Sequence, residues 1–475
     1  MEEEKANDQV SSLLMVNGLD YRMPPSLSVA VSRSHAVYVA NQQSYIPGQT
    51  VNIVMSNGAQ YVNFRESYLT FTVTMTGDDT VAANANTWSL GNQLVQESPA
   101  AYNPYKAENK LFVPGRNGAL NLFNASRWIH SSGTLLDEMP QDMALWSYIR
   151  NRYTYTSDQM WSQGSLAEFG NVNSAQTVWH PLLNTPATDP TEEKYVIRLS
   201  DIADCFNQQQ LCPSFICAGS RLELRLSDFS QAFTRIQTVN TTDADPVPGN
   251  VSYVMSNVSI VLQQIQLTDS IVRALSNISA SSGLEYPFTS IATNTTINSS
   301  QRGSIQQSRA LSRANAVIVV RRENSQMNGP RRYDLSSFCP SEKQITKYSC
   351  QLGGQTIPLS PVESPKEAYW QAQVTFGHAF DPTTCTPVTY LDFLGTPLPA
   401  AGALPPSGIS DAIYALSLET SSNLNQSGSA LSSQRVLVFD YVAELPANLD
   451  QAVYTMYVPH VRLCSSFLDS VIVRT

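Results

Sequence analysis

The sequence predicts an all-β chain of two tandem β-sandwiches with short helices and long loop insertions. Its 475 residues are enough for two or more domains, since a domain usually has about 100–200 residues. Apolar residues make up 42% of the chain, which is enough for buried cores. Alternating apolar and polar residues recur along the whole chain, and they resume after a helical segment near its middle.

The clearest predicted strand covers residues 67–75, where Leu69, Phe71, Val73 and Met75 alternate with tyrosine and threonines. This alternation is typical of a strand with one buried face. Further strands are expected at residues 35–40, 51–55, 195–199, 221–226 and 254–267, separated by turn-forming Gly, Pro, Asn and Asp. Residues 77–119 and 171–193 are predicted loop insertions, longer than ordinary connections.

Two helices are predicted, at residues 141–150 after Pro140 and at residues 269–277 behind a Thr268/Asp269 cap. The second helix lies near mid-chain, so we place the domain junction there. The division is an N-terminal arm at 1–32, a first sandwich at 33–279 and a second at 280–475. Strands in the second half are predicted at residues 286–291, 316–321, 344–352, 371–376, 413–418, 435–442 and 453–463.

Three pairs of segments indicate a tandem duplication. Residues 127–136 and 347–354 both read as a strand, a glycine turn and a short strand before an aromatic segment. Residues 221–226 resemble 435–440, and residues 259–267 resemble 454–463. The three segments occur in the same order in both halves, although the number of residues between them differs. The alternative is that any two β-sandwich halves look alike.

Charged residues make up only 14% of the chain, against roughly 25% in typical soluble domains. A polar but weakly charged surface suits a protein that is covered by copies of itself. The net charge of −10 argues against a nucleic-acid-binding protein, so any genome contact is expected to be local. We expect no transmembrane segment and no signal peptide, hence a soluble chain made in the cytosol.

The order of features in residues 121–233 resembles a known family. The stretch contains the strand-turn-strand at 127–136, Trp-Ser-Tyr-Ile-Arg-Asn-Arg-Tyr at 146–153, Leu-Cys-Pro at 211–213 and Arg-Leu-Glu-Leu-Arg-Leu at 221–226. It is similar to the double jelly-roll major capsid proteins of Polinton-like viruses, virophages and related tailless double-stranded DNA viruses. The second half resembles them in architecture and length.

The resemblance implies two tandem eight-stranded jelly-roll β-sandwiches and a structural role without catalysis or cofactors. The expected assembly is a homotrimer that forms a pseudo-hexameric capsomer of an icosahedral virion. Its partners would be neighbouring capsomers, penton proteins and minor capsid or cement proteins, with assembly in the cytoplasm or nucleus of the host cell. Two alternatives stay open: a two-domain carbohydrate-binding or carbohydrate-active protein, and a minor vertex or fibre protein with a single jelly roll.

Catalytic and metal-binding patterns are absent from the sequence. The five histidines are widely spaced, and His130 beside Ser131 and Asp137 lacks a nucleophile elbow. Cys205, Cys212 and Cys217 do not have the spacing of a zinc knuckle. The seven cysteines are an odd number without a regular framework, so we expect reduced thiols.

Two sets of residues are candidates for a structural role. The first is a basic concentration that could face acidic groups on the inner capsid face or between capsomers, or could be ordinary solvated arginines. It comprises Arg302, Arg309, Arg313, Arg321, Arg322, Arg331 and Arg332. The second set is expected to pack in the cores and comprises Phe71, Trp128, Trp146 and Trp370. The arm at 1–32 could lie along a neighbour or stay unfolded.

Overall fold

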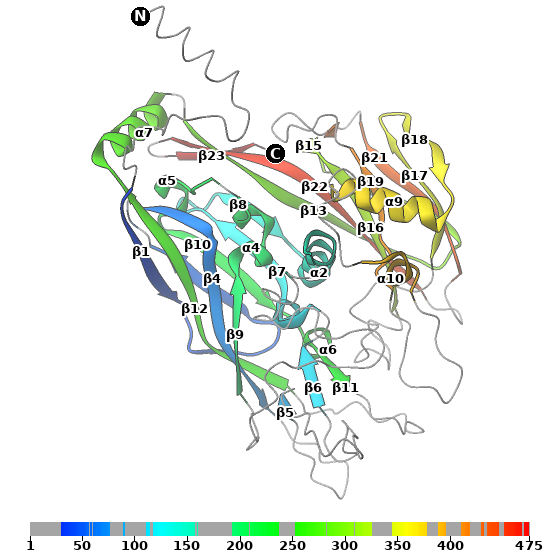
Figure 1. Cartoon of the computed structure of the whole chain (residues 1–475), viewed down its shortest axis with the longest axis horizontal. Helices are drawn as coiled ribbons and strands as arrows, with labels where there is room; N and C mark the ends of the chain where they lie inside the picture. Colours follow the sequence, from blue (N-terminus) through cyan, green and yellow to red (C-terminus); the bar gives the residue numbers. More distant parts are fainter. Residues whose placement is uncertain are drawn as a thin grey trace, which may run out of the picture.

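In the computed structural model the chain forms two β-sandwiches that lie side by side and are joined by α7 (Asp269–Ser281) (Figure 1). The structure describes residues 30–56, 58, 60–76, 89–90, 111–114, 117–156, 159, 192–208, 210–236, 252–281, 283–307, 309–324, 344–377, 388–395, 410–418, 429–431, 435–445, 451–467 and 470–474. Most of the two predicted insertions, and residues 1–29 of the predicted arm, lie outside this set. Residues 30–32 do not belong to an arm, because they begin the first strand.

The first sandwich consists of two antiparallel four-stranded sheets, with a short extra strand, β2 (Ser44–Tyr45), on one of them. One sheet has the spatial order β1 (Ala30–Val39), β12 (Ser252–Leu267), β4 (Tyr61–Thr76) and β9 (Glu192–Arg198). The other has the order β3 (Thr50–Met55), β10 (Ser220–Leu226), β7 (Phe123–Ile129) and β8 (Leu135–Met139).

The second sandwich has the same construction. One sheet contains β13 (Leu284–Asn298), β22 (Ala452–Phe467), β16 (Ala316–Glu323) and β19 (Tyr414–Ser417). The short strands β15 (Leu311–Ala314), β20 (Ser429–Leu431) and β23 (Ser470–Arg474) extend it. The other sheet has the order β14 (Arg302–Gln307), β21 (Leu437–Ala443), β17 (Ile345–Leu352) and β18 (Gln355–Val362).

The two sandwiches share one topology. When the eight main strands of each are numbered in chain order, the first sheet runs 1-8-3-6 and the second runs 2-7-4-5 in both halves. This is the jelly-roll arrangement of eight strands in two packed sheets. The three sequence correspondences fall on equivalent strands: β7–β8 with β17–β18, β10 with β21, and β12 with β22. The predicted repetition of the architecture is confirmed.

The core of the first sandwich follows from the alternation seen in the sequence. Leu69, Phe71 and Val73 on β4 are fully buried, and the threonines between them are half-buried. On β7 the buried Trp128 ring lies 5.7 Å from the Phe64 ring and 5.2 Å from the Phe206 ring. Its Nε1 donates a hydrogen bond of 3.1 Å to Ser220 Oγ, so the indole buries no unpaired donor.

Both predicted helices are present, as α2 (Met143–Thr154) and α7. The predicted strand at residues 371–376 is wrong, because these residues continue α9 (Pro365–Thr375). This helix begins with a capping box between Ser364 and Glu367 and with proline at its first position. Such an N-terminus satisfies the free backbone donors of the first turn and so favours a helix.

Of the four aromatic residues predicted in the cores, three are buried: Phe71, Trp128 and Trp146. The prediction for Trp370 is wrong, since this side chain is 54% exposed on α9. Only Ala368 and Ala372 of that helix are buried, so the indole lies on its solvent side. The five cysteines that the structure describes are buried free thiols: Cys205, Cys212, Cys217, Cys350 and Cys464.

Candidate functional site: the seam between the two sandwiches

The two sandwiches meet along a seam in which β8 and α2 of the first pack against β13 and β22 of the second (Figure 1). Among the described residues, aromatic rings cross it at three points, one of which is Tyr153 on α2, whose ring is stacked 5.2 Å from that of Phe376 at the end of α9. The Trp128 ring lies 6.1 Å from the Phe288 ring of β13, and the Trp146 ring lies 5.3 Å from the Tyr457 ring of β22. The seam is therefore packed like a domain core at these points.

A buried aspartate of the second sandwich accepts three hydrogen bonds from α2, two on its carboxylate and one on its backbone oxygen. Asp411, just before β19, accepts a hydrogen bond of 3.0 Å from Arg152 Nε and another from Tyr148 Oη. Its backbone oxygen accepts a bond of 2.7 Å from Tyr153 Oη. Tyr148 and Arg152 are four residues apart, so they lie on one face of the helix. Burial raises the pKa of Tyr153 well above its usual value, and Asp411 adds to this, so the phenol stays a donor.

The reverse pairing joins a carboxylate of the first sandwich to the second. Asp142, which precedes α2, lies 2.9 Å from Arg322 NH2 on β16. It also accepts a hydrogen bond of 3.2 Å from Thr455 Oγ1 on β22. Arg322 is buried, so its charge depends on this partner.

A second carboxylate of the first sandwich, Asp137 on β8, accepts a hydrogen bond from Ser290 Oγ on β13. It lies 3.6 Å from Arg462 NH1, which also donates a bond of 2.7 Å to the backbone oxygen of Leu136. Burial raises the pKa of Asp137, although Ser290 and Arg462 oppose the shift. Charges from each sandwich are thus held by the other sandwich, which makes the seam costly to open.

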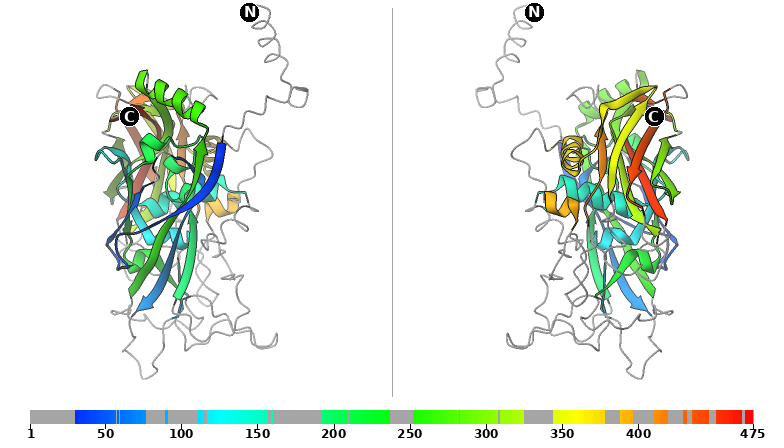
Figure 2. Two further views of the ribbon diagram at one scale, coloured as in Figure 1. Left: turned by 90° about the vertical axis from the view of Figure 1, so that its left-hand side faces the viewer. Right: turned by 90° about the vertical axis from the view of Figure 1, so that its right-hand side faces the viewer.

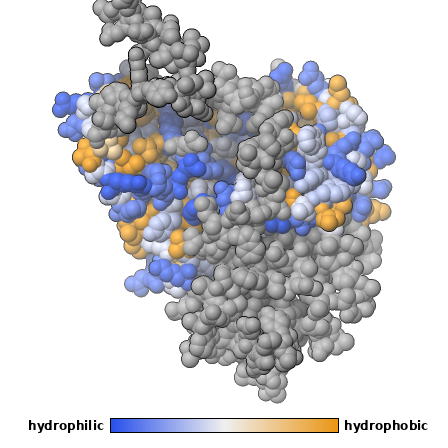
Figure 3. Space-filling model, in the orientation of Figure 1, coloured by the Kyte–Doolittle hydropathy of each residue, from blue (hydrophilic) through white to orange (hydrophobic). Residues whose placement is uncertain are grey.

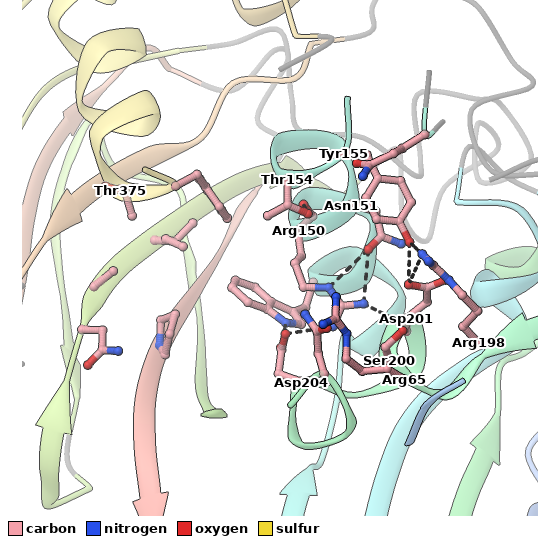
Figure 4. Close-up of a pocket in the computed structure, with 18 of the residues that line it drawn as sticks. Arg65, Arg150, Asn151, Thr154, Tyr155, Arg198, Ser200, Asp201, Asp204 and Thr375 are labelled. Atoms are coloured by element: carbon pink, nitrogen blue, oxygen red, sulfur yellow. Dashed lines mark hydrogen bonds and ion pairs between the residues drawn. The ribbon is translucent and has the colours of Figure 1, made fainter. Parts of the chain in front are cut away.

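A cavity of about 790 Å³ lies beside the seam and is lined by α2, α4 (Leu199–Ile202), β16 and the end of α9 (Figure 4). Two arginines of its lining pair with two carboxylates of the lining. Arg150 NH1 lies 2.9 Å from Asp204 Oδ1, and Arg198 NH2 lies 2.9 Å from Asp201 Oδ1. The cavity is lined by three arginines and three carboxylates, namely Arg65, Arg150, Arg198, Glu66, Asp201 and Asp204. The two buried or half-buried ion pairs favour a structural role for this part of the lining over a site for a charged ligand.

The structure does not bring His130, Ser131 and Asp137 together as a catalytic triad. His130 and Ser131 lie in the turn between β7 and β8. The Nε2 atom of His130 lies 3.5 Å from Ser131 Oγ and 3.0 Å from the backbone oxygen of Phe215. Asp137 lies in the seam with Ser290 and Arg462 instead. Within the part of the chain that the structure describes, no group of three His, Cys, Asp or Glu side chains is placed to hold a metal ion. No helix there is long and apolar enough to span a membrane.

The predicted basic patch does not form as one surface. Arg302, Arg309 and Arg313 are exposed on or near β14 and β15, whereas Arg321 and Arg322 are buried on β16. The Arg321 guanidinium lies over the Tyr454 ring, 5.9 Å from its centroid. Arg331 and Arg332 lie outside the described residues. Sequence reasoning missed the role of Arg322, because consecutive arginines at a strand end usually face solvent.

The residues of the seam were also missed: Asp142, Arg152, Asp411 and Arg462 carried no motif in the sequence. A usable signal was present only for Asp142, which follows Pro140 and lies in the first turn of the helix predicted at residues 141–150. Acidic residues are common at that position because they favour the helix N-terminus. Nothing in the sequence linked Asp411 with α2, about 260 residues earlier.

His460 on β22 gives the fold a pH dependence. It is fully buried, and burial lowers its pKa from 6.5 to about 4, with the charges of Arg462 and Arg309 acting in the same direction. The unfolded chain takes up the proton below about pH 6.5, so stability present above that pH is lost as the pH falls through about 4. We expect a loss of about 3 kcal/mol from this residue.

The measurement is urea unfolding of the wild type and of His460→Gln at pH 7 and pH 4.5. Other carboxyl groups titrate equally in both proteins, so the difference isolates the histidine. The variant should lose less stability than the wild type over this interval. Equal losses in the two proteins would contradict a neutral buried imidazole.

Two jelly rolls in tandem, fixed to each other by a buried seam, define this chain as a double jelly-roll protein. Solved structures with the same fold extend over almost its whole length. The Faustovirus major capsid protein superposes with a TM-score of 0.62 at 8% identity, covering 98% of each chain. A chain of the Sputnik virophage gives 0.63 at 11% identity, over 97% of this chain and 91% of that one. The mavirus major capsid protein gives 0.53 at 9% identity, over 96% and 92%.

No protein-family model matches the sequence, and no curated protein sequence is similar to it. At such low identities the structural likeness establishes the fold. The alternative of a single jelly roll with a large insertion is wrong, because β13 to β22 complete a second set of eight strands. Nothing in the likenesses supports the carbohydrate alternative.

Proposed function

We propose that this chain is the major capsid protein of an icosahedral double-stranded DNA virus and acts as a structural tile without catalysis. The observation that carries the proposal is the full-length match to the Faustovirus major capsid protein, which covers 98% of both chains. A match of this extent leaves little of either chain outside the shared fold. The paired charges of the cavity and the unformed triad agree with a structural role.

The seam makes such a capsid subunit rigid. Its reciprocal ion pairs and ring contacts join two sandwiches into one rigid unit with two similar bodies. Three copies would place six jelly rolls around an axis and form a pseudo-hexameric capsomer. Such capsomers would contact neighbouring capsomers, penton proteins and minor capsid or cement proteins in the virion. The acidic net charge limits contact with the genome to local patches.

The proposal also covers the domain boundary, the N-terminal segment and the place of assembly. The proposed boundary between the sandwiches at residues 279 and 280 is supported by α7, which contains it and separates the two sets of strands, while the first sandwich begins with β1 at residue 30 rather than at 33. The segment before β1 would act as an arm toward a neighbour in the shell. Assembly would take place in the cytoplasm or nucleus of the infected cell.

The test is the mass of the purified chain under native conditions, together with electron microscopy of the same sample. We expect a stable three-chain species at micromolar concentration and hexagonal particles in projection, because obligate interfaces of this kind are large. A sample that contains only monomer at that concentration would contradict the proposal.

A further inference from the structure

The seam uses different elements of the two sandwiches, and each of these elements has a topological equivalent that lies outside the seam, except that Phe376 at the C-terminal end of α9 stacks on Tyr153 of α2. The first sandwich contributes β8 and α2, whose equivalents in the second sandwich are β18 and α9. The second sandwich contributes β13 and β22, whose equivalents in the first are β1 and β12. Each sandwich therefore has a surface, outside the seam, that is equivalent to the surface with which the other sandwich enters the seam.

On the second sandwich the equivalent elements are exposed. Ten of the twelve residues of α2 are buried, but only two of the eleven in α9. Trp146 on α2 is 4% exposed, whereas Trp370 on α9 is 54% exposed. Leu359 on β18 is 95% exposed, and Leu391 on α10 (Tyr390–Leu394) is also exposed. We call Leu359, Trp370 and Leu391 the helix surface.

On the first sandwich the same contrast holds for β1. Its counterpart β13 is exposed at only two of its fifteen positions, whereas β1 is exposed at eight of its ten. Val31, Val37 and Val39 are 63%, 60% and 69% exposed. In the part of the chain that the structure describes, β1 pairs only with β12 and so forms the edge of its sheet. We call these three valines the β1 surface.

The two surfaces lie on opposite sides of the molecule. Figure 2 shows β1 in blue on one side and β18 with α9 in yellow on the other. Where Figure 3 colours the residues on the two sides of this view, apolar and hydrophilic residues are mixed. Apolar edge strands are uncommon on monomers because they favour association with other chains.

We propose that the helix surface of one copy of this chain packs on the β1 surface of the next copy, as β8 and α2 pack on β13 and β22 within the chain. The proposal rests on the proposed trimer and names the contact that builds it. Because the two surfaces differ, the contact is head to tail, and three such contacts close a ring. Trp370 then occupies the position that Trp146 has in the internal seam.

The ion pairs near the two surfaces and the tryptophan on the helix surface are consistent with burial in such a contact. Arg33 on β1 is paired with Glu66, and Lys347 on β17 is paired with Glu363, which lies just before α9. Cores of protein interfaces are depleted in unpaired charges and enriched in tryptophan, which often carries much of the binding energy. The second copy is favoured as occupant because the chain itself contains the template of the contact.

The experiment uses two full-length double variants. The helix-surface variant carries Leu359→Asp and Trp370→Asp, and the β1-surface variant carries Val37→Asp and Val39→Asp. Each alone should show the mass of one chain, against three for the wild type. An equimolar mixture should form a complex of one copy of each and nothing larger, because only one intact pair of surfaces remains.

The matched control is Ile278→Asp on α7, which changes a side chain that is 45% exposed outside both surfaces. It should retain three chains, and all variants should melt as folded proteins, since the changed residues are exposed. Variants that remain trimeric would overturn this contact while leaving the proposed function intact. A mixture that stays monomeric would also overturn it, and a monomeric wild type would overturn the proposed function as well.

Discussion

Replacement of Asp411 by alanine is expected to lower the free energy of unfolding by about 3–5 kcal/mol. The change leaves the guanidinium of Arg152 buried without its carboxylate, 3.0 Å away in the wild type, and removes the acceptor of Tyr148 Oη. A buried charge without a partner costs far more than the pair contributes. Urea unfolding at neutral pH and one fixed protein concentration measures the loss.

The matched control is Glu138→Ala, which removes the partner of Arg127 at 2.7 Å on β7 and β8. The Arg127 side chain is largely exposed, so water replaces the lost carboxylate. We expect a change of about 1 kcal/mol or less. If both variants lost the same small amount, the seam would not be the main link between the sandwiches.

Trp128→Ala is expected to cost about 3–5 kcal/mol, as for other large aromatic side chains removed from a core. The indole contacts the rings of Phe64 and Phe206 in its own sandwich and of Phe288 across the seam. Its removal also leaves Ser220 Oγ without the indole donor. Thermal melting and the yield of folded protein measure the effect.

His130→Ala, two residues further along the same hairpin, is the control for this change. Its ring bonds to the turn at Ser132 Oγ and to the backbone oxygen of Phe215, and it is not part of the aromatic core. We expect a change of no more than about 1 kcal/mol. A hydrolytic activity that disappeared in His130→Ala without any change in melting would contradict the structural role of the chain.

Local periodicity determined most of the strands and both long helices predicted from the sequence. The alternation on β4 predicts its buried face correctly because strand side chains point to opposite sides at every second residue. The repeated order of segments likewise predicted the second sandwich. These features depend on residues close together in the chain, so the sequence predicts them without knowledge of the tertiary contacts.

The tertiary structure decided which faces are covered and which charges are buried. Trp370 and Trp146 occupy equivalent helices, yet only the indole of Trp146 is covered by the other sandwich, through the ring of Tyr457. Arg152 and Arg322 are buried because carboxylates that are distant in sequence, Asp411 and Asp142, reach them across the seam. Whether a charge can be buried depends on a partner that folding supplies from elsewhere in the chain, and local sequence does not encode that partner.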